Sequence, residues 1–194
     1  MEYKLYHYNI DNFNDMGFGC SYRNLQTILS SFRHYYDNNI KIPDIKDLLY
    51  YFKPNYKHLI EIDNLNELWI EPYQISQYLQ DYNINALNLL YLFNDDDINK
   101  VIKTDIDVYD QRTYYKENFN SLLNIINYHF LCSKLPIVID DGVYSYCICK
   151  KNNDYLLISD PHIMTGDNMY EKPLSFLSDK TWMIYIPVNY SELL

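Results

Sequence analysis

Residues 16–29 read MGFGCSYRNLQTIL, and they join a turn bracketed by glycines to the start of an amphipathic helix. The chain has only four glycines, and Gly17 and Gly19 lie within three residues of Cys20. Glycine adopts backbone conformations that side chains forbid, and it allows another chain to approach closely. From Ser21 onward, apolar residues follow the i, i+3, i+4, i+7 spacing of a helix: Leu25, Ile28, Leu29 and Phe32. The stretch therefore predicts a turn that places Cys20 at the beginning of a helix with one buried face.

The remaining pattern divides the chain into a helical part and a sheet part. Further helices are expected to begin at Pro43 and Pro72 and to cover residues 118–135. Residues 1–10 are expected to form a strand or an extended arm, and the acidic run at 94–100 a solvated loop or helix start. Segments typical of strands cover residues 86–93, 136–141, 143–150, 155–160 and 181–188. Helices followed by mainly antiparallel strands predict an α+β fold.

Length, charge and cysteine content narrow the class of protein. With 194 residues, a single domain over residues 1–194 can bury a core without disulfides or metals. A net charge of −10 opposes nucleic-acid binding and fits a neutral or basic protein partner. No apolar run is long enough to span a bilayer, and residues 1–10 lack a signal-peptide pattern. These properties predict a cytoplasmic protein with reduced thiols at Cys20, Cys132, Cys147 and Cys149.

The position of Cys20 favours a nucleophile. Unpaired N–H groups and partial positive charge at a helix N-terminus stabilise a thiolate, which is the reactive form of cysteine. The alternative is a buried structural cysteine, which is common in protein cores. A lone cysteine does not distinguish the two, so the nucleophile hypothesis requires a base elsewhere in the chain.

His162 is the candidate base. It stands two residues after Asp160 at the end of an expected strand, so both side chains project to the same side of an extended segment. Pro161 fixes its own φ and biases Asp160 toward extended geometry. The alternative is an ordinary turn at a strand end, since Asp-Pro often opens turns. Of the four other histidines, His129 is expected to be a packed core residue, His34 and His58 are expected to lie on the surface, and His7 belongs to residues 1–10.

A cysteine on a helix N-terminus followed by a histidine on a sheet is the arrangement of papain-like thiol proteases, so Cys20, Asp160 and His162 together indicate that class. A zinc site at Cys147 and Cys149 is the alternative use of thiols. It lacks a second cysteine pair and a histidine at ligand spacing, so no metal and no cofactor are expected.

Several motifs resemble the cysteine proteases specific for the ubiquitin-fold modifier. GFGCSYRNLQT resembles their GWGCxYRxLQ box, and residues 6–20, YHYNIDNFNDMGFGC, resemble their Tyr-His-Tyr element at the same distance from the cysteine. DPHIMTG at 160–166 resembles their DPHYTG box. WIEPYQISQYL at 69–79 and PIVIDDGVYSY at 136–146 resemble their WIG-type segment and PVMIGGG-type strand. The order is the same throughout, so the resemblance covers nearly the whole chain.

This resemblance implies a papain-like α+β fold and an enzyme that matures the modifier precursor and removes the modifier from target lysines. It implies that Cys20 is the nucleophile, His162 the base and Asp160 its orienting partner. It also implies that the hydroxyl of Tyr8 stabilises the oxyanion, alongside the N–H of Cys20. The alternative for Tyr8 is a packed strand residue.

The chain departs from the family pattern where the C-terminal tail of a substrate is expected to lie. Phe18 replaces tryptophan, Asp140 and Asp141 stand in the glycine run before Gly142, and Tyr146 stands where the family often has histidine. One extra residue, Ile163 or Met164, interrupts the DPH-to-TG spacing. The expected substrate contacts are Phe18, Gly19, Trp69 and Gly142.

Three alternatives concern the partner and the activity. The autophagy cysteine proteases share similar boxes, but they have Met-Leu-Arg after the cysteine, whereas residues 21–23 here are Ser-Tyr-Arg. Ubiquitin is the second possible substrate, although the ubiquitin-cleaving branch carries added binding helices or zinc fingers that are not seen here. The third alternative is an inactive module that binds the modifier. The chain resembles the short form of the family that consists of the catalytic domain, and any membrane-tethering partner is unknown.

Overall fold

The computed structural model describes residues 2–55, 64, 67–93, 115–165 and 168–188. Its helices are α1 (Cys20–Tyr35), α2 (Ile45–Asn55), α4 (Pro72–Gln80), α7 (Phe119–Cys132) and the short 3-10 helix η4 (Leu174–Ser178). Its strands are β1 (Asn85–Tyr91), β2 (Tyr115–Glu117), β3 (Ile137–Asp140), β4 (Ser145–Lys151), β5 (Tyr155–Ser159), β6 (Met169–Pro173) and β7 (Trp182–Val188). The acidic run at 94–100 lies outside the described residues.

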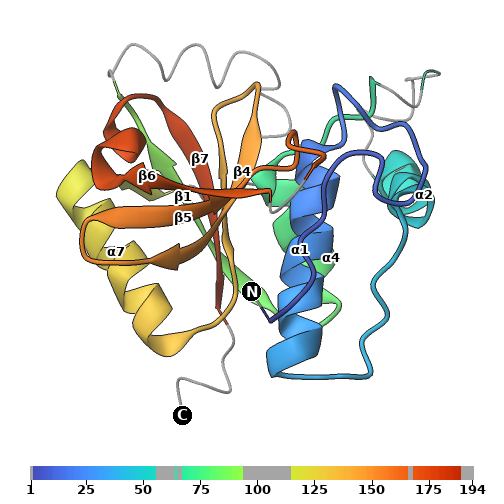
Figure 1. The fold of residues 1–194 in the computed structure, drawn as a ribbon, viewed down its shortest axis with the longest axis horizontal. Coiled ribbons are helices and arrows are strands. Elements are labelled where there is room, and N and C mark those ends of the chain that lie inside the picture. Colours follow the sequence, from blue (N-terminus) through green and yellow to red (C-terminus); the bar gives the residue numbers. More distant parts are fainter. Residues whose placement is uncertain (1, 56–63, 65–66, 94–114, 166–167, 189–194) are drawn as a thin grey trace.

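The strands form one 7-stranded sheet in the order β2-β1-β7-β3-β4-β5-β6. Every pair of neighbouring strands is antiparallel except β1 and β2, which are parallel. The sheet lies between two helical layers, with α7 on one face and α1, α2 and α4 on the other (Figure 1). The predicted α+β fold with a mainly antiparallel sheet is therefore confirmed.

Alternation along the central strands divides the core between the two faces of the sheet. Val138 of β3, Cys147 of β4 and Tyr185 of β7 pack among the side chains of α1, α2 and α4. Their neighbours Ile139, Ile148 and Ile184 pack on the α7 side. Successive side chains of a strand point to opposite faces, so these strands require apolar residues at nearly every position. This is why segments such as IVID, residues 137–140, contain no sustained polar alternation.

The N-terminal arm runs along α1 without forming a strand. The Tyr6 N–H donates to Thr27 Oγ1 at 3.0 Å, and the Lys4 N–H donates to Ser30 Oγ at 2.9 Å. Buried backbone donors need partners, and here hydroxyl groups of the helix supply them in place of a neighbouring strand. Residues 2–7 therefore form an arm without a strand, whereas residues 8–10 form a turn in which Asn9 has φ +60, which neither expectation included.

The sequence pattern did not predict β2, β6 or η4. β6 is an edge strand with the sequence MYEKP, and none of its residues is buried. Charged side chains on an edge strand protect its unpaired backbone groups, but they also remove the apolar alternation that predicts a strand. None of the described helices is both long and apolar enough to cross a membrane.

Candidate active site

Cys20 is the first residue of α1, and it is buried. The residue is 3 % exposed, and Gly19 is the N-cap without any side-chain cap. The first N–H groups of a helix have no partner within the helix and carry partial positive charge. Cys20 therefore occupies the position at the helix N-terminus that its surrounding sequence predicts.

Asp160 and His162 meet through a turn that follows β5. His162 Nδ1 lies 2.6 Å from Asp160 Oδ1, and the His162 backbone N–H donates to the same oxygen at 2.9 Å. The extended geometry predicted for this segment is wrong, because residues 161 and 162 form a turn. The carboxylate of Asp160 closes the turn and holds the ring at the same time, as aspartate side chains often do two residues before a backbone donor.

Hydrogen bonds shift the pKa values of His162 and Asp160 more than burial does, and they favour the charged form of each side chain. Burial lowers the pKa of His162, but hydrogen bonds to Asp160 and Cys20 raise it from 6.5 to about 9. Burial raises the pKa of Asp160, but hydrogen bonds from His162 and from Tyr170 bring it below 3.8. The Tyr170 hydroxyl donates to Asp160 Oδ2 at 3.2 Å. The raised pKa favours the protonated form of the His162 imidazole, which hydrogen-bonds Cys20.

Tyr8 covers the sulfur from the N-terminal arm. Its ring centroid lies 5.0 Å from that of His162 at an interplanar angle of 82°. Burial, followed by the proximity of Cys20, raises the pKa of the Tyr8 hydroxyl, so the group stays protonated and hydrogen-bonds Cys20. The Tyr8 N–H donates to the Pro161 carbonyl at 2.9 Å. The structure thus brings Cys20, His162, Asp160 and Tyr8 together, while their chemical roles remain predictions.

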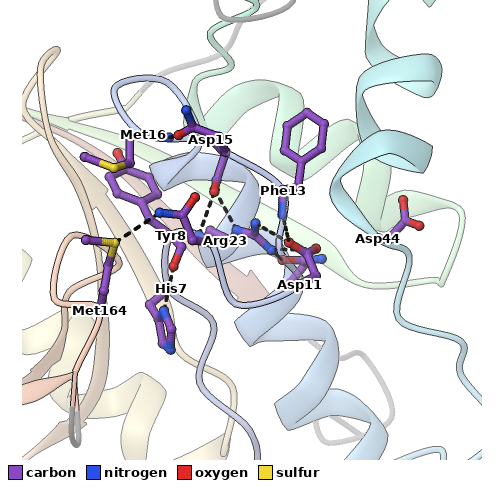
Figure 2. Close-up of polar contacts among 12 residues, drawn as sticks. His7, Tyr8, Asp11, Phe13, Asp15, Met16, Arg23, Asp44 and Met164 are labelled. Carbon is purple, nitrogen blue, oxygen red and sulfur yellow. Dashed lines mark hydrogen bonds and ion pairs between the residues drawn. The ribbon is translucent and has the colours of Figure 1, made fainter.

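A buried ion pair fixes the turn of Tyr8 to the helix of Cys20 (Figure 2). Asp15 Oδ1 accepts the Asn9 N–H at 2.9 Å, and Asp15 Oδ2 accepts Arg23 Nε at 2.6 Å. The side chains of Asp15 and Arg23 are both 0 % exposed. Asp11 pairs with the other end of the guanidinium at 2.8 Å. The loop between Tyr8 and Cys20 is therefore folded around the Arg23 side chain.

Sequence reasoning missed the roles of Arg23 and Asp15. Arg23 lies three residues after Cys20 in a helix whose residues from Cys20 to Phe32 are all buried. Its Nη1 also donates to Gln26 Oε1 at 3.0 Å, and Gln26 Nε2 donates to the Pro43 carbonyl at 2.8 Å. A charged residue inside a buried helix requires a partner. The sequence therefore held a signal for this buried ion pair: an arginine in the helix that begins at Cys20, and two aspartates in the loop before that helix.

Two of the four predicted substrate contacts have a different structural role. Phe18 is 1 % exposed and packs in the core on the α1 side of the sheet, 6.2 Å from the Tyr22 ring. The Phe18 side chain is enclosed by core residues, and contact between Phe18 and a substrate remains a prediction. Gly19 is also buried, and a Cβ built on it would lie 2.2 Å from Asp15 Oδ2. Glycine is therefore required at position 19 to make room for Asp15.

The other two predicted substrate contacts are accessible. Gly142 stands between β3 and β4 with φ +85, and a Cβ built on it would have no atom within 4 Å. Trp69 precedes α4 and is 46 % exposed. Contact between either residue and a substrate remains a prediction.

Of the other three cysteines, two are buried and one is exposed. Cys147 and Cys149 are buried, and burial raises the pKa of Cys147 and brings that of Cys149 to about 12. Cys132 is exposed and makes no disulfide.

His129 is a core residue as expected, with Nε2 2.7 Å from the Leu135 carbonyl. His34 is exposed as expected, and His58 lies outside the described residues. Within the described ranges, no three His, Cys, Asp or Glu residues are grouped to hold a metal ion.

The chain is similar to known proteins in both sequence and fold. The family model described as Peptidase family C78 matches residues 1–183. A rice protein, "Probable Ufm1-specific protease" from Oryza sativa subsp. japonica, is 24% identical over 173 residues, which are 86% of this chain and 24% of the rice protein.

The crystal structure of UfSP from C. elegans superposes with a TM-score of 0.67 at 20% identity, and the match covers 96% of this chain and 33% of the nematode chain. The chain therefore spans about a quarter to a third of the length of the relatives that it matches.

The packing of Asp15 against Gly19 predicts different outcomes for two neighbouring glycines. We expect Gly19→Ala to lower the free energy of unfolding by about 3 kcal/mol, because the new methyl group displaces the buried Asp15 from Arg23. Gly17 has φ +91 and open space around its Cβ position, so Gly17→Ala is expected to lower it by only about 1 kcal/mol. Urea unfolding of both variants measures the difference. Equal losses would show that Asp15 does not occupy a constrained position.

The hydrogen bonds of His162 predict its titration. In an NMR titration, the ring of His162 is expected to lose its proton at a pH of about 9, and in Asp160→Asn at a lower pH. A raised pKa in the folded state means that the protonated ring stabilises the fold below 6.5, and that this stabilisation is lost as the pH rises through about 9. A ring that titrates at 6.5 in the unaltered chain would contradict the ion pair.

Proposed function

The chain belongs to peptidase family C78, and on that basis we propose that it is a cysteine protease that cleaves the bond after the C-terminal residue of a ubiquitin-fold modifier. The observation that carries this proposal is the hydrogen-bonded series from Asp160 through His162 to the sulfur of Cys20. A base that is oriented by a carboxylate and touches a thiol at a helix N-terminus is the arrangement that nucleophilic catalysis by cysteine requires.

The first half of the proposed reaction forms a thioester. The Cys20 thiolate attacks the carbonyl carbon of the last residue of the modifier, and the carbonyl oxygen takes up negative charge. The protonated Tyr8 hydroxyl, which already lies against the sulfur, donates a hydrogen bond to this oxygen together with the N–H of Cys20. His162 then gives its proton to the leaving amine, the C–N bond breaks, and the thioester remains.

The second half releases the modifier. The now neutral His162 takes a proton from a water molecule, and the resulting hydroxide attacks the thioester carbonyl. The C–S bond breaks, and Cys20 leaves as the thiolate beside the reprotonated imidazole. Asp160 keeps Nδ1 of the ring occupied, so Nε2 faces the sulfur and the water throughout.

The name of the rice relative supports the choice of substrate, as does the negative net charge of −10, which fits a neutral or basic protein partner. Processing of a precursor and removal of the modifier from a lysine both break an amide bond after the same C-terminal residue, so the proposal includes both. We place the protein in a reducing compartment, the cytoplasm, and its four free cysteines support this placement.

Activity probes test the nucleophile and the substrate together. Three probes are used, each with a thiol-reactive group at its C-terminus. The first is the ubiquitin-fold modifier, the second is ubiquitin, and the third is an autophagy modifier. We expect a covalent adduct with the first probe only, and none in Cys20→Ala. Cys132→Ser is the matched control, because it removes an exposed thiol away from His162 and should label like the unaltered chain.

Each other outcome of the probe experiment has a distinct meaning. An adduct with another probe would support a cysteine protease that acts on a different modifier. An adduct that persists in Cys20→Ala refutes the assigned nucleophile. Binding of the modifier without any adduct or turnover would identify an inactive binding module.

The roles of Asp160 and His162 predict losses of different size. We expect the loss of kcat in Asp160→Asn to be about a hundredfold smaller than in His162→Ala, because Asp160 orients the base and does not transfer the proton. The measurement is hydrolysis of the modifier carrying a C-terminal coumarin amide. Unaltered turnover in Asp160→Asn would remove Asp160 from the catalytic group.

A further inference from the structure

The turn between β3 and β4 presents an exposed tyrosine to the candidate base. Tyr144 is 46 % exposed, yet its ring centroid lies 5.2 Å from that of His162 at an interplanar angle of 79°. Tyr8 contacts the same imidazole at a nearly identical distance and angle, and Tyr146 lies 5.9 Å away. The His162 ring is therefore surrounded by three tyrosine rings, of which Tyr144 is the exposed one.

The position of Tyr144 is fixed by the aspartates that replace the glycine run. Asp141 Oδ1 accepts the Tyr144 N–H at 2.7 Å and the Val143 N–H at 3.0 Å. Asp140 Oδ1 accepts the Gly142 N–H at 2.7 Å. The other carboxylate oxygen of Asp141 forms an ion pair with Lys180, whose Nζ also lies 5.9 Å from the centre of the Tyr144 ring. These contacts hold the turn in one conformation and Tyr144 against His162.

The tilt of the His162 ring needs a constraint besides its hydrogen bonds. The bonds to Asp160 and Cys20 hold the edges of the imidazole, but hydrogen bonds at the ring edges leave the ring plane able to tilt. Proton transfer to and from a substrate depends on the direction in which Nε2 points, and misplacement by about 1 Å reduces rates by about a hundredfold. Edge-to-face contacts between aromatic rings favour one relative orientation, so Tyr144 and Tyr8 restrict this tilt.

We propose that Tyr144 is a positioning residue that holds the His162 imidazole in the orientation required for proton transfer. This proposal rests on the proposed function, because it assigns Tyr144 a part in the same reaction. The aromatic ring acts by packing on His162, and the hydroxyl is not needed. Asp141 and Lys180 hold the Tyr144 ring in place, because Asp141 fixes the turn between β3 and β4 and Lys180 pairs with Asp141.

The kinetic test compares three variants in the Cys132→Ser background. The substrate is the ubiquitin-fold modifier with a C-terminal coumarin amide. We expect Tyr144→Leu to reduce kcat about tenfold with KM changed less than twofold, and Tyr144→Phe to keep kcat within about twofold of the parent. Tyr155→Leu is the matched control, because Tyr155 is 48 % exposed at the start of β5 and has no ring contact with His162.

Three kinetic outcomes overturn the proposal. If Tyr144→Leu keeps the parental kcat, the ring does not position His162. A rise in KM alone would make Tyr144 a substrate contact instead of a positioning residue. Equal losses in Tyr144→Phe and Tyr144→Leu would transfer the effect to the hydroxyl.

Alkylation of Cys20 separates failure of this proposal from failure of the proposed function. Iodoacetamide at pH 7 reports the thiolate that His162 stabilises, and it needs no protein substrate. We expect fast alkylation in the Cys132→Ser parent and about tenfold slower alkylation in Tyr144→Leu, with rescue in Tyr144→Phe. Fast alkylation in both the parent and Tyr144→Leu refutes the role of Tyr144 alone. A parent that reacts no faster than an ordinary thiol refutes the proposed nucleophile as well.

Discussion

The ion pair between Arg23 and Asp15 is the constraint on which the candidate site depends. Both side chains are fully buried, and removing Arg23 would leave Asp15 as an uncompensated charge in the core. Asp15 also accepts the Asn9 N–H, so the loop that follows Tyr8 keeps one geometry relative to α1. Gly19 follows from the same constraint, because a side chain there would occupy the place of the carboxylate. The spacing between Tyr8 and Cys20 is thus a consequence of how the chain encloses one arginine.

The site lies where the helical layer meets the end of the sheet. α1 supplies Cys20, the turn after β5 supplies His162, and the N-terminal arm bridges them through the bond between the Tyr8 N–H and the Pro161 carbonyl. The turn between β3 and β4 adds Tyr144. No single element contains the site, so its geometry depends on the packing of the sheet against α1.

The sequence predicted those features that depend on local patterns. Apolar periodicity located α1 and the central strands because their burial on the sheet requires it, and short motifs located Cys20, Asp160, His162 and Tyr8. Local patterns were insufficient where tertiary packing determines whether a residue is buried. The sequence pattern did not show that Phe18 packs in the core, or that Asp15 is fully buried in the loop before Cys20. The edge strand β6 was missed because its charged residues suit solvent and not the core.

The hydrogen bond between Tyr8 and Pro161 also bears on when the candidate site assembles during synthesis. It joins two segments that are far apart in the sequence, and non-local contacts of this kind carry a large loop-closure entropy and slow folding. A nascent chain that has emerged only as far as α7 contains Cys20 and Tyr8 but neither His162 nor the strands that carry it. The residues of the candidate site can therefore meet only after β5 and the turn that follows it have been synthesised and packed against α1.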